Sequence, residues 1–275
     1  MAITAGMVKA LREKTGLPMM ECKQALDEAG GDEAKAIELL RKKGLGQVGK
    51  RSARDTSEGR VACVVDPGTG CGGIVELQCE TAPVANTADF TTLADAIARV
   101  AAKMDNPTPE SVLSQPLPDE PGRTIQDLMT DVVNRLRENI RVARVGRLAG
   151  HVGHYLHHNG QVGVVVEMTA DCPVEAKTDV CMHIAAMRPA CTRREEVDPA
   201  LVEQERKVAQ EQVQGKPANI VDKIVEGKLN RWYSDIVLLE QPFVKDDKVS
   251  VGAMLGNVAA GLSVRQYIRY EVGGE

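Results

Sequence analysis

Aromatic residues are scarce in this chain, which has one tryptophan, two phenylalanines and four tyrosines among 275 residues. Its hydrophobic cores must therefore be built from Val, Leu, Ile, Ala and Met. The sequence also lacks an apolar run of the roughly 18 residues that a membrane span needs, and its first residues lack the apolar stretch of a secretory signal. We therefore expect a soluble, cytoplasmic protein that does not bind a membrane.

Cysteines are present but do not form a recognisable framework. There are seven of them, an odd number, and no two are spaced as C-x-x-C. A set of disulfides or a zinc knuckle is therefore not supported, and the thiols are expected to be reduced. Cys22 and Cys181 fall at apolar helical positions, where a thiol usually packs as a small hydrophobic group.

The net charge is −5, and the only basic runs are the short ones at 41–43 and 50–51. Direct binding of nucleic acid is therefore not expected. The chain has no G-x-x-x-x-G-K-[ST] motif, so it should not hold a nucleotide itself. We expect no cofactor.

A histidine-rich stretch raises the alternative of a metal or thiol enzyme. Five histidines lie near Cys172 and Cys181 in the sequence, at positions 151, 154, 157, 158 and 183. On a strand, however, His154 and His158 share one face and His157 points to the other, so the three converge poorly on one ion. We therefore do not expect a metal or catalytic site, and the chain is not predicted to be an enzyme.

The stretch 152–168 predicts a β-hairpin. Asn159 and Gly160 separate two extended runs and suit a two-residue type I′ turn. This turn would pair Tyr155 with Val164 and place the alternate valines of the second strand on a core face with Tyr155. A similar phrase, G-G-I-V-E-L, occurs at 72–77, and each copy leads into a helix with an Ile-Ala pair. The middle of the chain therefore predicts a duplication around two sheets.

The fold class is predicted to be α+β. Thr4 and Asp32 are expected to start helices in an amino-terminal three-helix bundle, and Thr124 is expected to start a later one. The Pro-rich segment 106–122 is predicted to be a surface loop with one helical turn near 112–113. The domain boundaries that we expect are a bundle at 1–45, a linker helix or flexible tether at 46–58, a first core subdomain at 59–139, and a second at 140–275 that carries a helical hairpin at about 198–233.

The bundle is too small to bury much apolar surface, so it is a candidate docking module. Met19, Met20 and Lys23 lie at the start of its second helix and are the expected contact residues. A bundle of this kind is also typical of modules that bind ubiquitin. The helical hairpin, connected at Gly215 and Lys216, has charged outer faces that predict solvated surface.

Several stretches resemble the elongation factor Ts family. They are V-K-A-L-R-E-K-T-G-L-P-M-M-E-C-K-Q-A-L (8–26), V-G-H-Y-L-H-H-N-G (152–160), K-P-A-N-I-V-D-K-I-V-E-G-K-L (216–229), L-L-E-Q-P-F-V-K-D-D (238–247) and Y-I-R-Y-E-V-G (267–273). The resemblance implies a UBA-like amino-terminal module, a core of two homologous subdomains and a coiled-coil arm. It also implies exchange of GDP for GTP on elongation factor Tu, bound in its GDP-loaded and nucleotide-free forms.

One functional motif of that family is altered here. The family motif C-E-T-D-F-V places an Asp and a Phe against the Mg²⁺ and phosphate region of elongation factor Tu, and this chain has C-E-T-A-P-V instead. Ala82 and Pro83 therefore replace the wedge, and the alternative is a non-catalytic or chaperone-like partner of a translational GTPase. Phe90 belongs to a second Asp-Phe pair and is expected in the core.

The resemblance and the docking argument together give the expected partner-binding residues. They are Met19, Met20 and Lys23 in the bundle, Thr81, Ala82, Pro83 and Val84 after the first hairpin, Leu136 and Arg137 on a strand between the subdomains, and His157 near the second hairpin tip. For His157 the alternative is a partly exposed histidine at a strand end.

Overall fold

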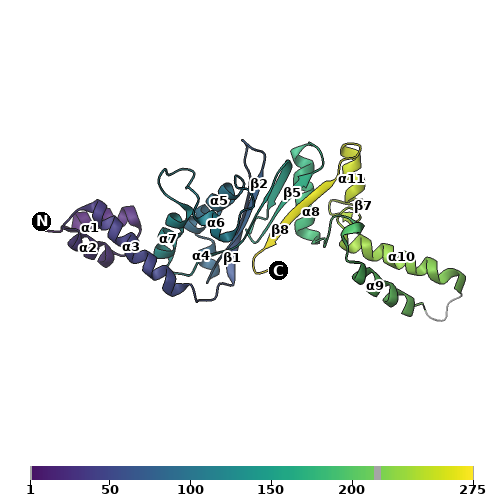
Figure 1. Cartoon of the computed structure of the whole chain (residues 1–275), viewed down its shortest axis with the longest axis horizontal. Helices are drawn as coiled ribbons and strands as arrows, with labels where there is room; N and C mark the ends of the chain where they lie inside the picture. The colour runs from purple at the N-terminus through teal and green to yellow at the C-terminus, as the bar shows by residue number, and fades with distance from the viewer. Residues whose placement is uncertain (1, 214–217, 275) are drawn as a thin grey trace.

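The computed structural model describes residues 2–213 and 218–274. The chain is elongated, with a helical module at its amino-terminal end, two sheets in the middle and a pair of helices projecting at the far end (Figure 1). The α+β class is confirmed, with helices and small antiparallel sheets. Among the described residues, no helix is both long enough and apolar enough to cross a membrane.

Three helices form the amino-terminal module: α1 (Ala5–Thr15), α2 (Met19–Glu28) and α3 (Glu33–Arg51). Thr4 caps α1 as predicted, because its hydroxyl accepts a hydrogen bond from the Met7 amide. Cys22 is fully buried among Leu11 and Leu26, which confirms its place in the core. Helix α3 continues to Arg51, so its helical backbone extends into the segment that was expected to be a linker helix or a tether.

The first sheet has the antiparallel order β1-β2-β3, formed by β1 (Glu58–Val65), β2 (Gly72–Cys79) and β3 (Arg141–Leu148). Helix α5 (Ala88–Ala101) packs on one face of this sheet, and α7 (Ile125–Leu136) packs against α5 in the same core. Glycine is required at Gly73, because a Cβ there would lie 2.1 Å from the Ala98 carbonyl oxygen. Strand β3 pairs with β2, so the first sheet includes residues up to Leu148. The expected subdomain boundary between residues 139 and 140 is therefore wrong, because it would assign β3 to the second subdomain.

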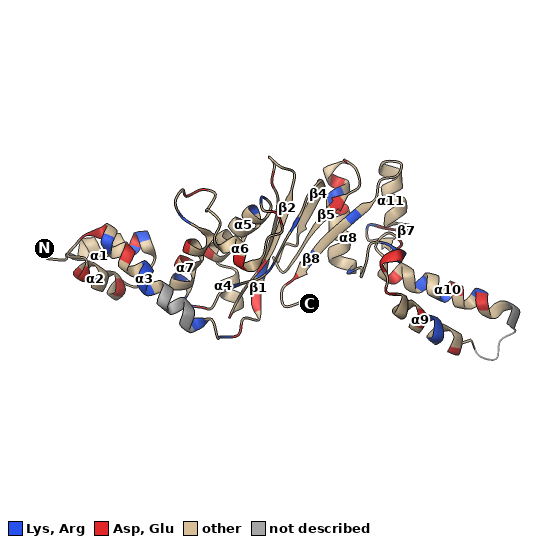
Figure 2. Ribbon diagram, in the orientation of Figure 1, with Lys and Arg blue, Asp and Glu red and all other residues tan. Residues whose placement is uncertain are grey.

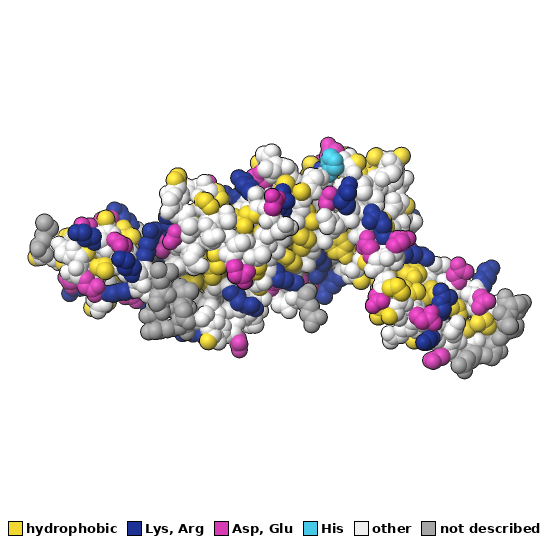
Figure 3. Space-filling model, in the orientation of Figure 1, with side chains coloured by type: hydrophobic (Ala, Val, Ile, Leu, Met, Phe, Trp, Pro, Cys, Tyr) yellow, Lys and Arg dark blue, Asp and Glu magenta, His cyan; other side chains and the backbone are white. Residues whose placement is uncertain are grey.

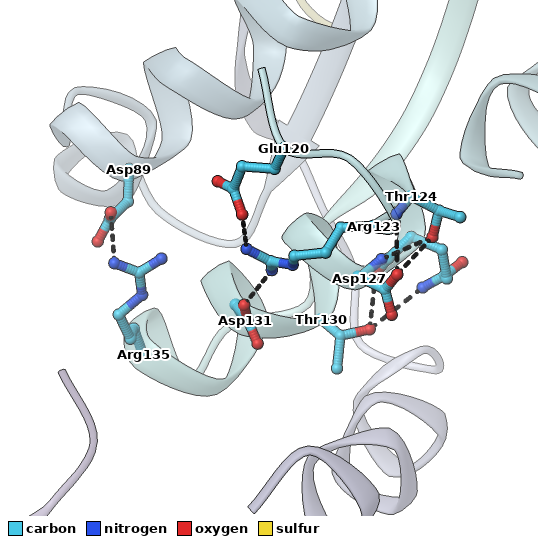
Figure 4. Close-up of polar contacts among 9 residues, drawn as sticks. Asp89, Glu120, Arg123, Thr124, Asp127, Thr130, Asp131 and Arg135 are labelled. Atoms are coloured by element: carbon cyan, nitrogen blue, oxygen red, sulfur yellow. Dashed lines mark hydrogen bonds and ion pairs between the residues drawn. The ribbon is translucent and has the colours of Figure 1, made fainter. Parts of the chain in front are cut away.

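The segment between α5 and α7 contains one short helix, α6 (Pro109–Leu113), which confirms the helical turn predicted in the Pro-rich loop. Thr124 caps α7 as predicted, and the side chain of Asp127 accepts from the Thr124 amide in return. Figure 4 shows this capping box beside the ion pairs of Arg123 with Glu120 and Asp131. The capping box fixes the start of α7, and the ion pairs hold the half-buried Arg123 side chain against the helix.

The second sheet has the antiparallel order β4-β5-β8, formed by β4 (His151–Leu156), β5 (Val162–Met168) and β8 (Val264–Glu271). Tyr155 pairs with Val164, which confirms the predicted register. The predicted type I′ turn is wrong, because only Gly160 has positive φ and its amide donates to the His157 carbonyl. The turn is held by its surroundings: the Asn159 side chain accepts from the Gln161 amide, and Val61 of the first sheet donates to the Gly160 carbonyl.

The two sheets pack face to face through a layer of buried residues: Val61, Ile74, Leu148, Val152 and Val165. On the outer side of the second sheet lie α8 (Val174–Met187) and α11 (Val251–Val258), with Cys181 buried as predicted. The middle of the protein therefore has four layers, helices, sheet, sheet and helices, with the two expected small antiparallel sheets (Figure 1). A further pair of short strands, β6 (Pro242–Phe243) and β7 (Asp246–Ser250), completes the second subdomain.

The projecting arm consists of α9 (Pro199–Glu211) and α10 (Ala218–Ile236), which follow a short 3-10 helix at Arg194–Glu196. The two helices pack through small and branched side chains: Ala209, Val213, Val225 and Leu229. Gly215 and Lys216, expected to connect them, lie outside the described residues. At the root of the arm, the Arg194 guanidinium lies 4.3 Å from the Tyr233 ring centre and pairs with Glu240.

A buried histidine links α8 to the root of the arm. His183 is fully buried, its Nε2 lies 3.0 Å from the Gln241 side-chain oxygen, and its Nδ1 accepts from the Val244 amide. Gln241 in turn donates to the backbone carbonyl of Asp235 at the end of α10. Burial lowers the pKa of His183 below its usual 6.5, because the charged form loses solvation. The ring is therefore neutral in the folded protein near neutral pH.

This burial predicts a loss of stability in mild acid. Below pH 6.5 the unfolded chain binds a proton at residue 183 that the folded chain does not, so the free energy of unfolding should fall as pH drops from 6.5 toward the lower folded pKa. The fall should not exceed about 1.4 kcal/mol per pH unit from this group. Urea unfolding of the wild type and His183→Gln between pH 7.5 and 5 would measure it. Equal pH slopes for the two proteins would contradict it.

Candidate partner interface

The module carries a wide surface groove between α1 and α2, with a volume of about 830 Å³. Met19 and Met20 lie along it with 53% and 63% of their surface exposed, and Lys23 lies one turn further on. Lys9 and Arg12 of α1 also line it and make its rim largely cationic. The structure therefore brings the three predicted module residues together. Exposed methionines are flexible apolar groups that adapt to a partner surface.

The second predicted contact is a one-turn helix, α4 (Ala82–Ala85), which follows β2 directly. We call residues 81–84 the tip. Thr81, Ala82 and Pro83 are exposed and Val84 is half-buried, so the tip presents a small, mostly apolar surface. Burial raises the pKa of the Cys79 thiol to about 12, and this protonated thiol donates to the Thr81 carbonyl at 3.2 Å.

The second Asp-Phe pair is structural. Phe90 is fully buried in the core of the first subdomain, as predicted. Asp89 lies 2.9 Å from the Arg135 guanidinium, which Figure 4 shows reaching toward it from α7. Neither residue replaces the missing wedge at the tip.

Leu136 and Arg137 were expected on a strand between the subdomains, but the structure does not place them on one. Leu136 is the last residue of α7, and Arg137 caps that helix with a left-handed φ of 62°. The guanidinium of Arg137 donates to Glu21 of α2 at 2.6 Å. Arg137 therefore lies against the module, and in this structure it pairs with the protein's own chain.

His157 is half-buried beside the second hairpin tip. Its Nδ1 lies 2.9 Å from the Tyr155 hydroxyl, and its ring centre is 4.3 Å from that of His158. His154 and His158 are both exposed, but strand β4 ends at Leu156, so the expectation that His157 and His158 lie on the same strand as His154 is wrong. Within the described part of the chain, no group of three His, Cys, Asp or Glu side chains is placed to hold a metal ion.

Two of the expected contact regions are connected through residues that follow α7. Glu138 accepts hydrogen bonds from the tip, and Arg137 reaches the module from the adjacent position. The sequence offered no signal for Glu138 or Glu21, because each is one polar residue among many and their partners are distant in the chain. Charged residues of both signs are interspersed over the described surface in the view of Figures 2 and 3.

The groove and the tip expose apolar side chains at two separate places, as expected for a protein that docks on a partner. A family model described as Elongation factor TS matches residues 80–274. The chain is 40% identical to Elongation factor Ts of Aquifex aeolicus, over 100% of this chain and 99% of that protein. It is 42% identical to the protein of that name from Methylococcus capsulatus, over 99% and 93% of the two chains. The chain belongs to the elongation factor Ts family.

Proposed function

We propose that this protein promotes exchange of GDP for GTP on elongation factor Tu in the cytoplasm, without covalent chemistry. The observation that carries the proposal is the match to elongation factor Ts over the whole chain, at 40% identity. The exposed groove and the exposed tip support it, because they are suited to contact a partner at two separate places. The protein would bind elongation factor Tu in its GDP-bound form and hold it more tightly once GDP has left.

The mechanism follows from thermodynamic linkage. A factor that binds the empty partner more tightly than the loaded one weakens nucleotide binding by the same ratio. A ratio of about 10⁴ corresponds to about 5.5 kcal/mol, which one large interface can supply. Disturbing the phosphate-binding loop or its Mg²⁺ is an effective way to obtain that difference, because phosphates are held by several donors together.

In this proposal the two surfaces have different tasks. The module, which we take to be UBA-like and to span residues 1–45, would use Met19, Met20 and Lys23 to hold the GTP-binding domain. The tip would approach the Mg²⁺ and phosphate region, and His157 would contact the partner from the second subdomain. The arm at about 198–233 would be a coiled coil that leaves the core free to dock.

A fluorescent-GDP release assay with elongation factor Tu tests the proposal. We expect the protein at micromolar concentration to accelerate release by at least about 100-fold, in line with the linkage above. Binding without acceleration would instead support the alternative, a non-catalytic partner of a translational GTPase. The argument for that alternative is that Ala82 and Pro83 replace the usual wedge. The match to the family favours exchange.

A further inference from the structure

Glu138, which follows the end of α7, forms hydrogen bonds to the tip and to the residue before it. One carboxylate oxygen accepts from the Glu80 and Thr81 amides at 3.1 and 3.0 Å, and the other accepts from the Thr81 hydroxyl at 2.6 Å. A helix of four residues such as α4 is not stable on its own, so its orientation depends on contacts of this kind. Ala85 anchors α4 in the core, and Glu138 fixes the backbone of the residues that lead into it.

The residues on each side of Glu138 bond to other parts of the chain. Arg137 pairs with Glu21 of the module. Asn139 donates from its side chain to the Arg54 carbonyl at 2.8 Å, in the segment that joins the module to the core. Its amide donates to the Glu80 side chain at 2.7 Å. We call residues 137–139 the clasp.

The left-handed backbone at Arg137 makes the clasp possible. A φ of 62° ends the helix abruptly and turns successive side chains to different neighbours. One turn earlier, the module rests closely on α7 at Gly44, where a Cβ would lie 1.8 Å from the Asn134 side-chain nitrogen. The module is therefore seated on the same helix whose end holds the tip.

We propose that Glu138 is a positioning residue for nucleotide release, which orients the tip relative to the amino-terminal module. This inference rests on the proposed exchange function and adds to it. Glu138 binds no nucleotide and need not touch the partner. It acts through the Glu80 and Thr81 amides, so that a partner held by the module meets the tip in one fixed orientation.

The test compares Glu138→Ala with Glu138→Gln in the full chain. Alanine removes all three hydrogen bonds, whereas glutamine keeps a carbonyl oxygen for the two amides and an amide that can donate to the Thr81 hydroxyl. We expect the alanine variant to lower the maximal rate of fluorescent-GDP release about tenfold, with the half-saturating concentration changed less than about twofold. Glutamine should restore most of the rate.

A second measurement reports the geometry without the partner. Hydrogen exchange of the Glu80 and Thr81 amides should be faster in Glu138→Ala than in Glu138→Gln, because only alanine leaves these donors unprotected. Glu110→Ala is the matched control, since Glu110 is an exposed glutamate on α6 far from the clasp in sequence. It should leave both measurements unchanged.

Three results would overturn the inference. They are a maximal rate that is unchanged in Glu138→Ala, a loss of rate that appears only as weaker half-saturation, or a glutamine variant as slow as the alanine variant. Failure of the proposed function is distinct, because the wild-type protein itself would then not accelerate release. If the alanine variant does not fold, Thr81→Val removes one of the three hydrogen bonds at nearly the same volume and should slow release by about twofold to threefold. An unchanged rate in that variant would count against the inference.

Discussion

Replacing Met19 and Met20 together with serine should weaken binding to elongation factor Tu by about 100-fold, because two exposed apolar side chains would no longer be buried at the interface. Both residues lie at the start of α2 with more than half of their surface exposed, at 53% and 63%. Full burial of a methionine is worth about 1.5–3 kcal/mol, and just over half of each residue is exposed and can still be buried, so the pair should contribute about 1.7–3.5 kcal/mol, a range that includes the 100-fold effect. Titration calorimetry against the nucleotide-free partner measures the change.

The folding of the module should not suffer in this variant, because neither methionine belongs to its buried core. Met187→Ser is the matched control, since Met187 is also an exposed methionine, at 43%, but lies at the end of α8 on the second subdomain. It should bind as the wild type does. Equal affinities for the double variant and the control would show that the groove is not the docking surface.

Restoring the family wedge at the tip, as Ala82→Asp with Pro83→Phe, should raise the maximal rate of GDP release about tenfold, which corresponds to about 1.4 kcal/mol of additional discrimination. Both positions are exposed, so the new side chains can reach a partner without disturbing the core. A phenylalanine brings an aromatic surface that can bury 150–250 Å², roughly. The aspartate adds a charge that would compete with the phosphates for Mg²⁺.

The two substitutions should contribute unequally. Ala82 follows Thr81, which is bonded to the Glu138 carboxylate, so Ala82→Asp would add a second negative charge to the tip and some of its benefit should be lost to repulsion. We therefore expect Pro83→Phe alone to give most of the gain. Val174→Phe, which adds an aromatic ring at a position with 70% exposure on α8, is the control and should leave the rate unchanged. If the restored wedge gave no gain, the tip would not be the contact that drives release in this protein.

Local signals predicted much of the fold. Thr4 and Thr124 cap helices because a hydroxyl beside free amides needs no tertiary partner to act. The register of Tyr155 with Val164 followed from the position of the hairpin loop and the alternation of the strands. Phe90 of the second Asp-Phe pair was predicted in the core, and it is fully buried.

The errors occurred where distant parts of the chain decide the outcome. Asn159 keeps a negative φ in a turn whose Gly160 carbonyl is bound by Val61 of the other sheet. The strand β3 could not be assigned to a sheet by its own pattern, because either sheet would have accepted an edge strand. Arg137 was placed on a strand, but it ends α7 and faces Glu21, more than a hundred positions earlier in the chain. Contacts of this range leave no local pattern.

The most direct test of the account is the affinity of the protein for the two forms of elongation factor Tu, measured by calorimetry under one set of conditions. We expect the nucleotide-free form to bind at least about 100-fold more tightly than the GDP-loaded form, since the same ratio must appear as weakened GDP binding. Equal affinity for the two forms would contradict the account, whatever the strength of binding.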